Sequence, residues 1–175
     1  PDDGLVTFGA SGTDKCDLEV FFRNQKVKPQ KSDDIPFRGR QRSQGSAIIE
    51  FRQLDLVHMR KRLGDRAKFT VDEAVVGTNK LGHLEREWLF EDAAQQRVVI
   101  EYDGVKFAIT AKPDGILTYH PDNSRLLFEY KTKASGIRAM NSKLDYSGPQ
   151  ADHLRQVTAE SLVFGLREGI LLYES

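Results

Sequence analysis

The clearest hydrophobic pattern in this 175-residue chain is the alternation along two neighbouring stretches near its centre. Apolar side chains occupy every second position over 98–102 and again over 105–109, with Asp103-Gly104 between them. A period of two is typical of a half-buried strand, and a two-residue Asp-Gly link is typical of a tight turn. The pattern therefore predicts a β-hairpin over about 98–109.

A second hairpin is predicted immediately downstream. The short apolar run 116–119 leads into the turn-forming residues 121–124, and alternation resumes over 126–130. The turn residues indicate that the second strand returns alongside the first. Farther along, 170–173 has the composition of a short buried strand, whereas 84–90 fits a strand and a helix equally well.

Helical spacing begins after a polar stretch. Residues 24–46 are rich in Lys, Arg, Gln and Ser and contain prolines and glycines, so they predict a loop. A helix is expected to follow it and to end at Gly64, because the basic last turn 60–62 suits a helix C-terminus. Its apolar stripe consists of Ala47, Ile48, Phe51, Leu54 and Val57.

A second helix is predicted over about 150–166, after a stretch over 134–149 that has little periodicity and is expected to be a loop. Helical spacing gives it an apolar stripe and a neighbouring polar face. The expected inward stripe is Leu154, Val157, Ser161 and Phe164, and the adjacent face carries His153, Gln156 and Glu160.

Composition narrows the class of protein. A chain of this length, 39% hydrophobic and 30% charged, can build one domain over 1–175 with a core of its own. It contains no apolar run of membrane-spanning length and no signal-peptide pattern. Cys16 stands alone and cannot form an internal disulfide or a four-cysteine site, which favours a reducing, cytoplasmic compartment.

Candidate chemistry lies at the second hairpin. Asp114 follows Pro113 just before the first strand, and the second strand carries Glu129 and Lys131 on one face, about 7 Å apart. The hairpin brings Asp114 near Glu129. Carboxylates are the ligands that Mg²⁺ and Mn²⁺ prefer, and the Tyr130 carbonyl can add a further oxygen.

This arrangement points to phosphodiester hydrolysis, because such an ion polarises a phosphoryl oxygen and lowers the pKa of a bound water. Lys131 would then orient or deprotonate the attacking water and stabilise charge in the transition state. The alternative is a surface hairpin that carries a solvated Glu-Lys pair.

The net charge is zero, but the charges are distributed unevenly. Residues 23–68 hold thirteen Lys or Arg and five Asp or Glu, which makes this segment +8 and the rest of the chain −8. A local basic patch favours a phosphate backbone through counterion release. The alternative is an ordinary solvated loop and helix.

Two further residues are candidates for completing the metal site. Glu50 lies along the apolar stripe of the first helix, and a carboxylate that points inward needs a partner such as a metal. It could instead border the stripe and pair with Arg52, Arg60 or solvent. His83 stands about thirty residues before Asp114 and is a reserve ligand, although a lone histidine is more often structural.

The order of these motifs resembles the RecB-like branch of the PD-(D/E)XK nuclease superfamily. It is most similar to the small phage-encoded exonucleases and the related CRISPR-adaptation nucleases. The acid, Glu-x-Lys-Thr and His-x-x-Gln blocks stand in the order of that family over most of the chain. The matching segments are 11–16, 44–50, 114–115, 129–132, and His153 with Gln156.

The resemblance implies an α/β fold with a mixed central sheet flanked by helices, the restriction-endonuclease-like core. It also implies that Asp114 and Glu129 hold Mg²⁺ or Mn²⁺ while Lys131 aligns water for in-line attack. DNA contacts are expected from the basic segment and the last helix. The candidates for these contacts are Gln156, His153, Arg42 and Lys133.

Three departures from the family pattern stand out. The metal-binding histidine expected on the helix is replaced by Ile49 followed by Glu50, which makes Glu50 the candidate ligand. The tyrosine expected four residues after Gln156 is replaced by Glu160. Some relatives carry an iron–sulfur cluster with four cysteine ligands, which the single Cys16 excludes.

The sequence thus predicts a Mg²⁺- or Mn²⁺-dependent deoxyribonuclease, with an exonuclease favoured. Its partner would be single- or double-stranded DNA, its location the cytoplasm of a bacterium or a phage-infected host, and a homo-oligomer is possible. Two alternatives stay open: an endonuclease of the same fold, and a degenerate member that binds nucleic acid or a protein without cutting.

Overall fold

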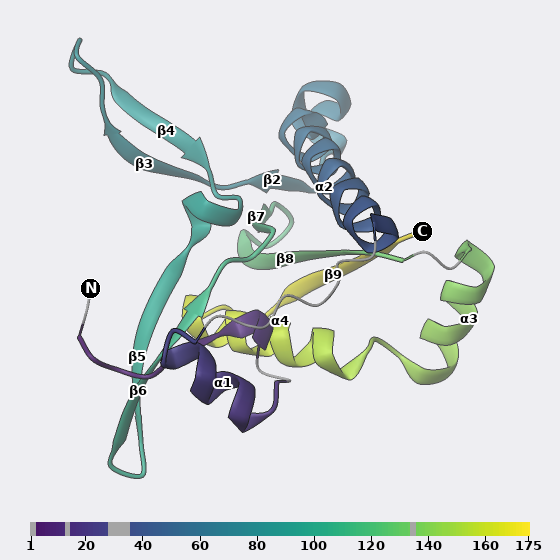
Figure 1. Cartoon of the computed structure of the whole chain (residues 1–175). Helices are drawn as coiled ribbons and strands as arrows, with labels where there is room; N and C mark the ends of the chain where they lie inside the picture. The colour runs from purple at the N-terminus through teal and green to yellow at the C-terminus, as the bar shows by residue number, and fades with distance from the viewer. Residues whose placement is uncertain (1–2, 13–14, 28–35, 134–135) are drawn as a thin grey trace.

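The structure is a computed structural model, which describes residues 3–12, 15–27, 36–133 and 136–175 (Figure 1). Three short 3₁₀ turns, η1 (Ala10–Gly12), η2 (Gly64–Arg66) and η3 (Glu91–Ala94), join the longer elements. The helices are α1 (Asp17–Asn24), α2 (Pro36–Leu63), α3 (Ile137–Ser147) and α4 (Ala151–Phe164). The strands are β1 (Thr7–Gly9), β2 (Phe69–Val71), β3 (Glu73–Thr78), β4 (Leu84–Trp88), β5 (Gln96–Tyr102), β6 (Val105–Ala111), β7 (Gly115–Tyr119), β8 (Ser124–Thr132) and β9 (Gly169–Glu174).

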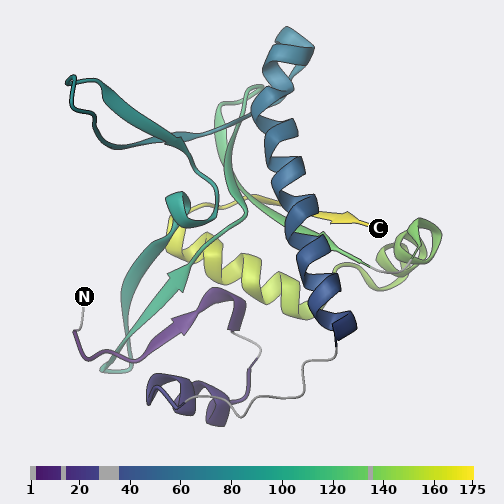
Figure 2. The ribbon, with the colours of Figure 1, turned by 45° about the horizontal axis from the view of Figure 1, so that its top comes forward.

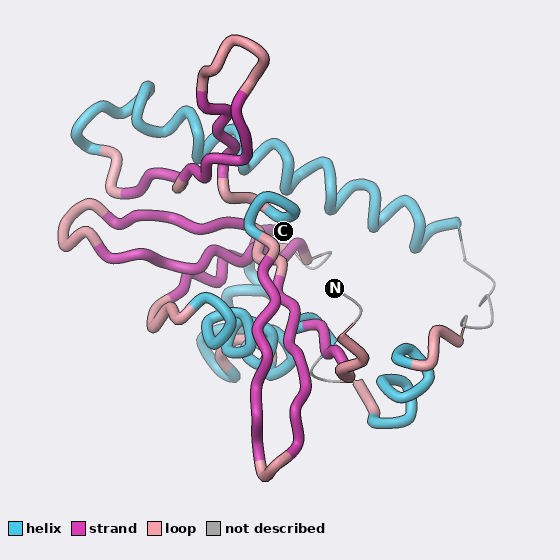
Figure 3. Tube along the Cα trace, turned by 90° about the vertical axis from the view of Figure 1, so that its left-hand side faces the viewer, coloured by secondary structure: helices cyan, strands magenta, loops and turns pink. Residues whose placement is uncertain are grey.

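The described strands form three sheets. One has the order β2-β7-β8-β9, in which β9 runs parallel to β8 and the other pairs are antiparallel. A second has the order β1-β6-β5, and β3 pairs with β4 in a separate hairpin that projects from the rest (Figures 1 and 3). Mixed sheets accompanied by helices confirm the expected α/β mixed-sheet class.

Strand β8 is covered on both faces. Its residues 126–130 are all buried, which is the pattern of a central strand rather than of an exposed one. Phe128 and Tyr130 form a core cluster with Val71 and Leu117, and residues of α2 pack against it. The intervening residues Glu129 and Lys131 face α4, so α2 and α4 lie on opposite faces of β8 (Figure 2).

Both predicted hairpins are confirmed. β5 and β6 are antiparallel, and their turn residues Asp103 and Gly104 have positive φ angles of 49° and 72°. That conformation is the one that an Asp-Gly pair favours in a tight hairpin. β7 and β8 are paired from Gly115↔Phe128 to Tyr119↔Ser124, so the second hairpin places Asp114 beside β8, just beyond the last pair.

The loop predicted over 24–46 is wrong from Pro36 onward, because α2 begins there and continues unbroken to Leu63. Residues 28–35 of that prediction lie outside the described part of the chain. Proline suits the first turn of a helix, since its fixed φ is helical and the N–H that it lacks would be unpaired there. Gly45 lies where α2 approaches β8, and a Cβ at this position would be 3.3 Å from the Thr132 hydroxyl. This close packing explains why α2 has a glycine at position 45, although glycine disfavours a helix.

The expected apolar stripe of α2 is also only partly correct. Val57 packs on the core with Ile49 and Leu56, but Phe51 and Leu54 are 62% and 55% exposed. The face turned inward also carries the polar side chains of Arg52 and Gln53, which bond to Glu174 and to the Asp114 carbonyl. A polar group can face a core when it has such partners.

The loop predicted over 134–149 is wrong as well, because residues 137–147 form α3. The inward face of α4 differs from the predicted stripe: Leu154 is 46% exposed, whereas Glu160 and Val163 are buried. Val163 joins Ala10 and Ala111 in a second core cluster, which holds α4 against β6. The polar face of α4 therefore points toward β8.

Candidate functional site

Asp114 lies in the short link between β6 and β7, where the chain passes from one sheet to the other. Its Oδ2 accepts a hydrogen bond of 2.7 Å from the backbone N–H of Tyr130. From the other side, Nε2 of Gln53 on α2 donates to the Asp114 carbonyl at 3.2 Å. The carboxylate is thus fixed between the end of β7 and the middle of β8.

Glu129 and Lys131 meet a polar face of α4. Lys131 Nζ donates to Glu129 Oε1 at 2.6 Å and to Gln156 Oε1 at 2.9 Å. Gln156 Nε2 in turn donates to Glu129 Oε1 at 2.7 Å and to Glu160 Oε1 at 3.0 Å. One glutamine therefore joins the strand carboxylate, the lysine and a second carboxylate on its own helix.

The two glutamates are deeply buried. Glu129 is 2% exposed and Glu160 is 1% exposed. The second carboxylate oxygen of each, Oε2, is buried and has no hydrogen-bond partner among the described residues. Buried polar atoms are normally bonded, so unbonded carboxylate oxygens here indicate a place for a cation or a shared proton.

Burial and mutual repulsion raise the pKa values of these acids. Desolvation, followed by the charge of Glu129, raises the pKa of Asp114 to about 7. Desolvation, followed by the charge of Glu160, raises the pKa of Glu129 to about 7 as well. The pKa of Glu160 is also raised, chiefly by desolvation. Such shifts are typical of functional sites, although structural networks produce them too.

The donor set fits a hard divalent ion that is shared with a substrate. Lys131 pairs with Glu129, so ionised Asp114, Glu129 and Glu160 together would leave an excess of negative charge. Within the described ranges, however, no three His, Cys, Asp or Glu side chains are arranged to hold a metal between them. Mg²⁺ commonly uses only one or two protein carboxylates and completes its shell with phosphate and water.

The Tyr130 carbonyl is directed toward the same edge of β8 as Asp114. In a strand, the N–H and C=O of one residue point to the same side. Since the N–H of Tyr130 bonds to Asp114, its carbonyl also faces the space beyond the end of β7. This geometry is compatible with the predicted oxygen ligand.

The expectation that Glu50 points inward is wrong, because its side chain is exposed on α2. Gln53, one turn along α2, bonds to the Asp114 carbonyl. His83 is exposed in the turn between β3 and β4, at the end of the hairpin that projects away from β8 (Figure 1). Among the described residues, no group of three His, Cys, Asp or Glu side chains that includes Glu50 or His83 is arranged to hold a metal.

Glu160 is the acid that sequence reasoning missed at this site. It follows Gln156 by four residues, so the two share one face of α4. That spacing is visible in the sequence. The apolar stripe beside it was expected to face inward, however, so the polar face was not expected to be buried against β8. A row of polar residues at spacings of three and four was the usable signal.

The remaining candidates are His153, Lys133 and Arg42. The His153 ring contacts the Tyr173 hydroxyl at 2.7 Å, and burial, followed by the charge of Lys133, lowers its pKa. Lys133 Nζ donates to Gln150 Oε1. Arg42 belongs to α2, but its side chain lies outside the described residues.

A charged network ties α2 to the sheet next to the site. Arg52 donates to both carboxylate oxygens of Glu174, at 2.7 Å and 2.5 Å, and the Tyr130 hydroxyl donates to the same carboxylate. The Arg52 guanidinium and the Tyr130 hydroxyl lower the pKa of Glu174 to about 2. This network holds one face of β8 in place while the opposite face carries the acids.

None of the described helices is both long enough and apolar enough to cross a membrane. No family model matches the sequence, and a search of curated proteins found no significant relative. Among solved structures, the chain is similar to SSO0001, with 14% identity and a TM-score of 0.49. The match covers 97% of this chain and 61% of SSO0001, and it is too distant to bear on activity.

Proposed function

We propose that this chain is a Mg²⁺- or Mn²⁺-dependent nuclease that hydrolyses DNA phosphodiester bonds, most simply as an exonuclease of the RecB-like type with a restriction-endonuclease-like core. The observation that carries the proposal is the cluster of half-buried Asp114 with the buried Glu129 and Glu160 beside Lys131, in which two carboxylate oxygens are unbonded among the described residues. The order of the sequence motifs supports the same activity.

Asp114, Glu129 and the Tyr130 carbonyl would hold the ion. When bound, it would polarise a phosphoryl oxygen and lower the pKa of a coordinated water. The N–H of Tyr130 fixes Asp114 in position, and Gln156 fixes Glu129. Both carboxylates would therefore be oriented before substrate arrives, which lowers the cost of reorganisation.

Lys131 is placed to act on the reacting phosphate. An ammonium group has three hydrogens, and two of them serve Glu129 and Gln156. The third is available for a phosphate oxygen or for the attacking water, and the side chain is 21% exposed and so accessible. In this role Lys131 positions water and stabilises the charge that develops on phosphorus-bound oxygens.

Cleavage assays with Mn²⁺ on end-labelled linear DNA and on closed circular DNA test this proposal. Asp114→Asn and Lys131→Met are expected to lower the rate by roughly a hundredfold or more while circular dichroism stays unchanged. Matched controls are Asp103→Asn in the exposed β5–β6 turn and Lys80→Met in the exposed β3–β4 turn.

The pattern of products separates the candidates. Release of short products from linear DNA alone supports an exonuclease, and cutting of the circle identifies the endonuclease alternative. If wild-type protein binds DNA and cuts neither substrate, the chain is the non-cleaving binding module. Rates like wild type in both Asp114→Asn and Lys131→Met would refute the mechanism.

A further inference from the structure

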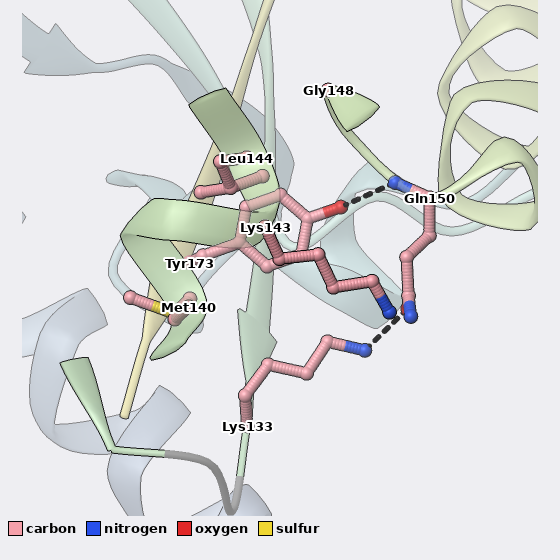
Figure 4. A pocket seen from close by; sticks show the side chains of 7 residues that line it. All are labelled: Lys133, Met140, Lys143, Leu144, Gly148, Gln150 and Tyr173. Atoms are coloured by element: carbon pink, nitrogen blue, oxygen red, sulfur yellow. Dashed lines mark hydrogen bonds between the residues drawn. The ribbon is translucent and has the colours of Figure 1, made fainter. Parts of the chain in front are cut away.

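A small pocket lies beside the candidate site, between the end of β8, helix α3 and strand β9 (Figure 4). Its volume is about 70 Å³. A water molecule takes up about 30 Å³ of the liquid, so the pocket has room for a compact group and not for a nucleotide base. The lining used below consists of Lys133, Lys143, Gln150, Met140, Leu144 and Tyr173.

The polar rim of the pocket is cationic. Lys133 extends from the end of β8 to the Gln150 amide, and Lys143 reaches toward the same region from α3 (Figure 4). Burial lowers the pKa of Lys133; the charge of Asp152 acts to raise it, and the smaller effects of Lys143 and Lys131 lower it. Within the described part of the chain, neither Lys133 nor Lys143 forms an ion pair with a carboxylate. An anion would relieve this repulsion.

The other walls of the pocket are apolar. Met140 is buried, Leu144 is half-buried, and the Tyr173 ring lies 5.9 Å from Lys133 Nζ. Tyr173 is fixed by its hydroxyl, which accepts from the Gln150 backbone N–H. Apolar walls lower the local dielectric and strengthen the attraction between the ammonium groups and an anion.

The pocket lies next to the candidate site along the direction of β8. Lys133 follows Lys131 by two residues, and its N–H donates to the Glu174 carbonyl at 2.8 Å, so the β8–β9 ladder runs on to it. Glu129, Lys131 and Lys133 therefore occupy one face at steps of about 7 Å. A step of that size is on the scale of the distance between neighbouring phosphates of one strand.

We propose that this pocket binds a phosphate group of the substrate strand, next to the phosphate that is cleaved. The inference rests on the proposed nuclease function and deepens it. Lys133 and Lys143 would supply the charge, and Gln150 a directional hydrogen-bond donor. The phosphate could be an internal diester or a terminal monoester, and the two differ in charge and in where they occur on the strand.

Oligonucleotide binding in the absence of metal tests the pocket separately from catalysis. The affinity of wild type and Lys143→Met for a fluorescent single-stranded oligonucleotide is measured over a series of salt concentrations. Loss of one phosphate contact is expected to reduce the slope of log affinity against log salt by about 0.7. Lys80→Met, which removes a lysine from a distant exposed turn, should keep the wild-type slope.

Oligonucleotides with and without a 5′-phosphate distinguish the two sources of phosphate. If wild type prefers the phosphorylated strand and Lys143→Met loses that preference, the pocket takes a terminal monoester. An equal loss of affinity for both strands identifies an internal diester. If Lys143→Met has the same salt slope as wild type, the proposal of a phosphate pocket is overturned, even if the enzyme cleaves DNA. If the protein binds the oligonucleotide without metal but shows no Mn²⁺-dependent cleavage, only the proposed nuclease activity is overturned.

Discussion

Glu160 is the side chain whose environment is hardest to explain without a ligand. It is almost fully buried, it accepts one hydrogen bond from Gln156, and its second oxygen has no described partner. After desolvation, its charge is the largest influence that raises the pKa of Glu129, which sits at the end of the same hydrogen-bonded chain. In the metal-free protein, therefore, two carboxylates oppose each other in a place that water does not reach.

Replacing Glu160 by Gln is expected to stabilise the metal-free protein. The amide would keep the shape of the side chain and could donate to Glu129, while one of two repelling charges is removed. At about pH 8 the melting temperature should rise by roughly 2–4 °C, the shift that about 1 kcal/mol gives in a chain of this size. Thermal unfolding in EDTA measures it.

The effect should be smaller at about pH 5 than at about pH 8, because burial raises the pKa of Glu160 and protonation therefore removes its charge at a higher pH than in the unfolded chain. Glu168→Gln is the matched control, since Glu168 is exposed beyond the end of α4. A lower melting temperature for Glu160→Gln at both pH values would mean that Glu160 is a structural hydrogen-bond acceptor rather than a strained acid.

Some of the site was predictable from single residues and some was not. The alternation around Glu129 and the turn before it suffice to put Asp114 and Lys131 near that carboxylate, because a hairpin has few possible registers. The position of Glu50 was not predictable in the same way. Which face of a helix turns inward depends on its tertiary partners, and on α2 the inward side chains include the polar Arg52 and Gln53, whose partners are Glu174 and Asp114.

At the scale of elements, α2 shows how packing overrides local preference. Its first eleven residues contain Gly39, Gly45 and two serines, which taken alone favour a loop. The sheet supplies a surface on which the later turns of the helix pack, and propagating an existing helix costs less than starting one. The sequence therefore predicted the C-terminal end of α2 correctly and its beginning too late.

Two glycine substitutions test whether residues 36–46 are helical. A Cβ at Gly39 meets nothing within 4 Å, so Gly39→Ala should stabilise the protein by about 0.5–1 kcal/mol through helix propensity alone. A Cβ at Gly45 would lie 3.3 Å from the Thr132 hydroxyl. Gly45→Ala should therefore gain less than Gly39→Ala, or lose stability.

Urea unfolding of both variants measures the difference. If residues 36–46 are helical, the free energy of unfolding should be higher for Gly39→Ala than for Gly45→Ala. The negative ellipticity at 222 nm should also become larger in Gly39→Ala. Equal, near-zero effects in the two variants would instead support the loop that the composition suggested.

At the scale of the whole molecule, the distribution of charge makes the stability of the fold depend on pH and on bound metal. The fold buries acids on one face of β8 and balances Glu174 with Arg52 on the other. Arg52 suffices to lower the pKa of Glu174 to about 2, whereas Lys131, which pairs with Glu129, does not offset burial and repulsion, and the pKa values of Asp114 and Glu129 are raised to about 7. The two faces must therefore respond to pH in opposite directions.

The metal-free protein is expected to lose stability as the pH rises from about 5 to about 8. Asp114 and Glu129 have ordinary pKa values of 3.8 and 4.5, so in this range the unfolded chain has lost protons that the folded chain still holds. Stability falls with pH wherever the folded state binds more protons. The Glu174 contribution does not offset this loss, because it is complete above pH 4.5 and fades only as the pH falls toward 2.

Mn²⁺ should reverse this trend, because its ligands must be deprotonated before it binds. Melting temperatures measured with EDTA and with Mn²⁺ should differ little at about pH 5.5 and by several degrees at about pH 8, since a ligand at a hundred times its Kd adds about 2.7 kcal/mol. Asp114→Asn should remove most of the Mn²⁺ effect and also flatten the decline in EDTA, because one of the two titrating acids is gone. The exposed Asp103→Asn should alter neither. If Mn²⁺ stabilises the wild type and Asp114→Asn equally at both pH values, the ion binds elsewhere. The carboxylates with raised pKa values would then share protons in the core and would not form a metal centre.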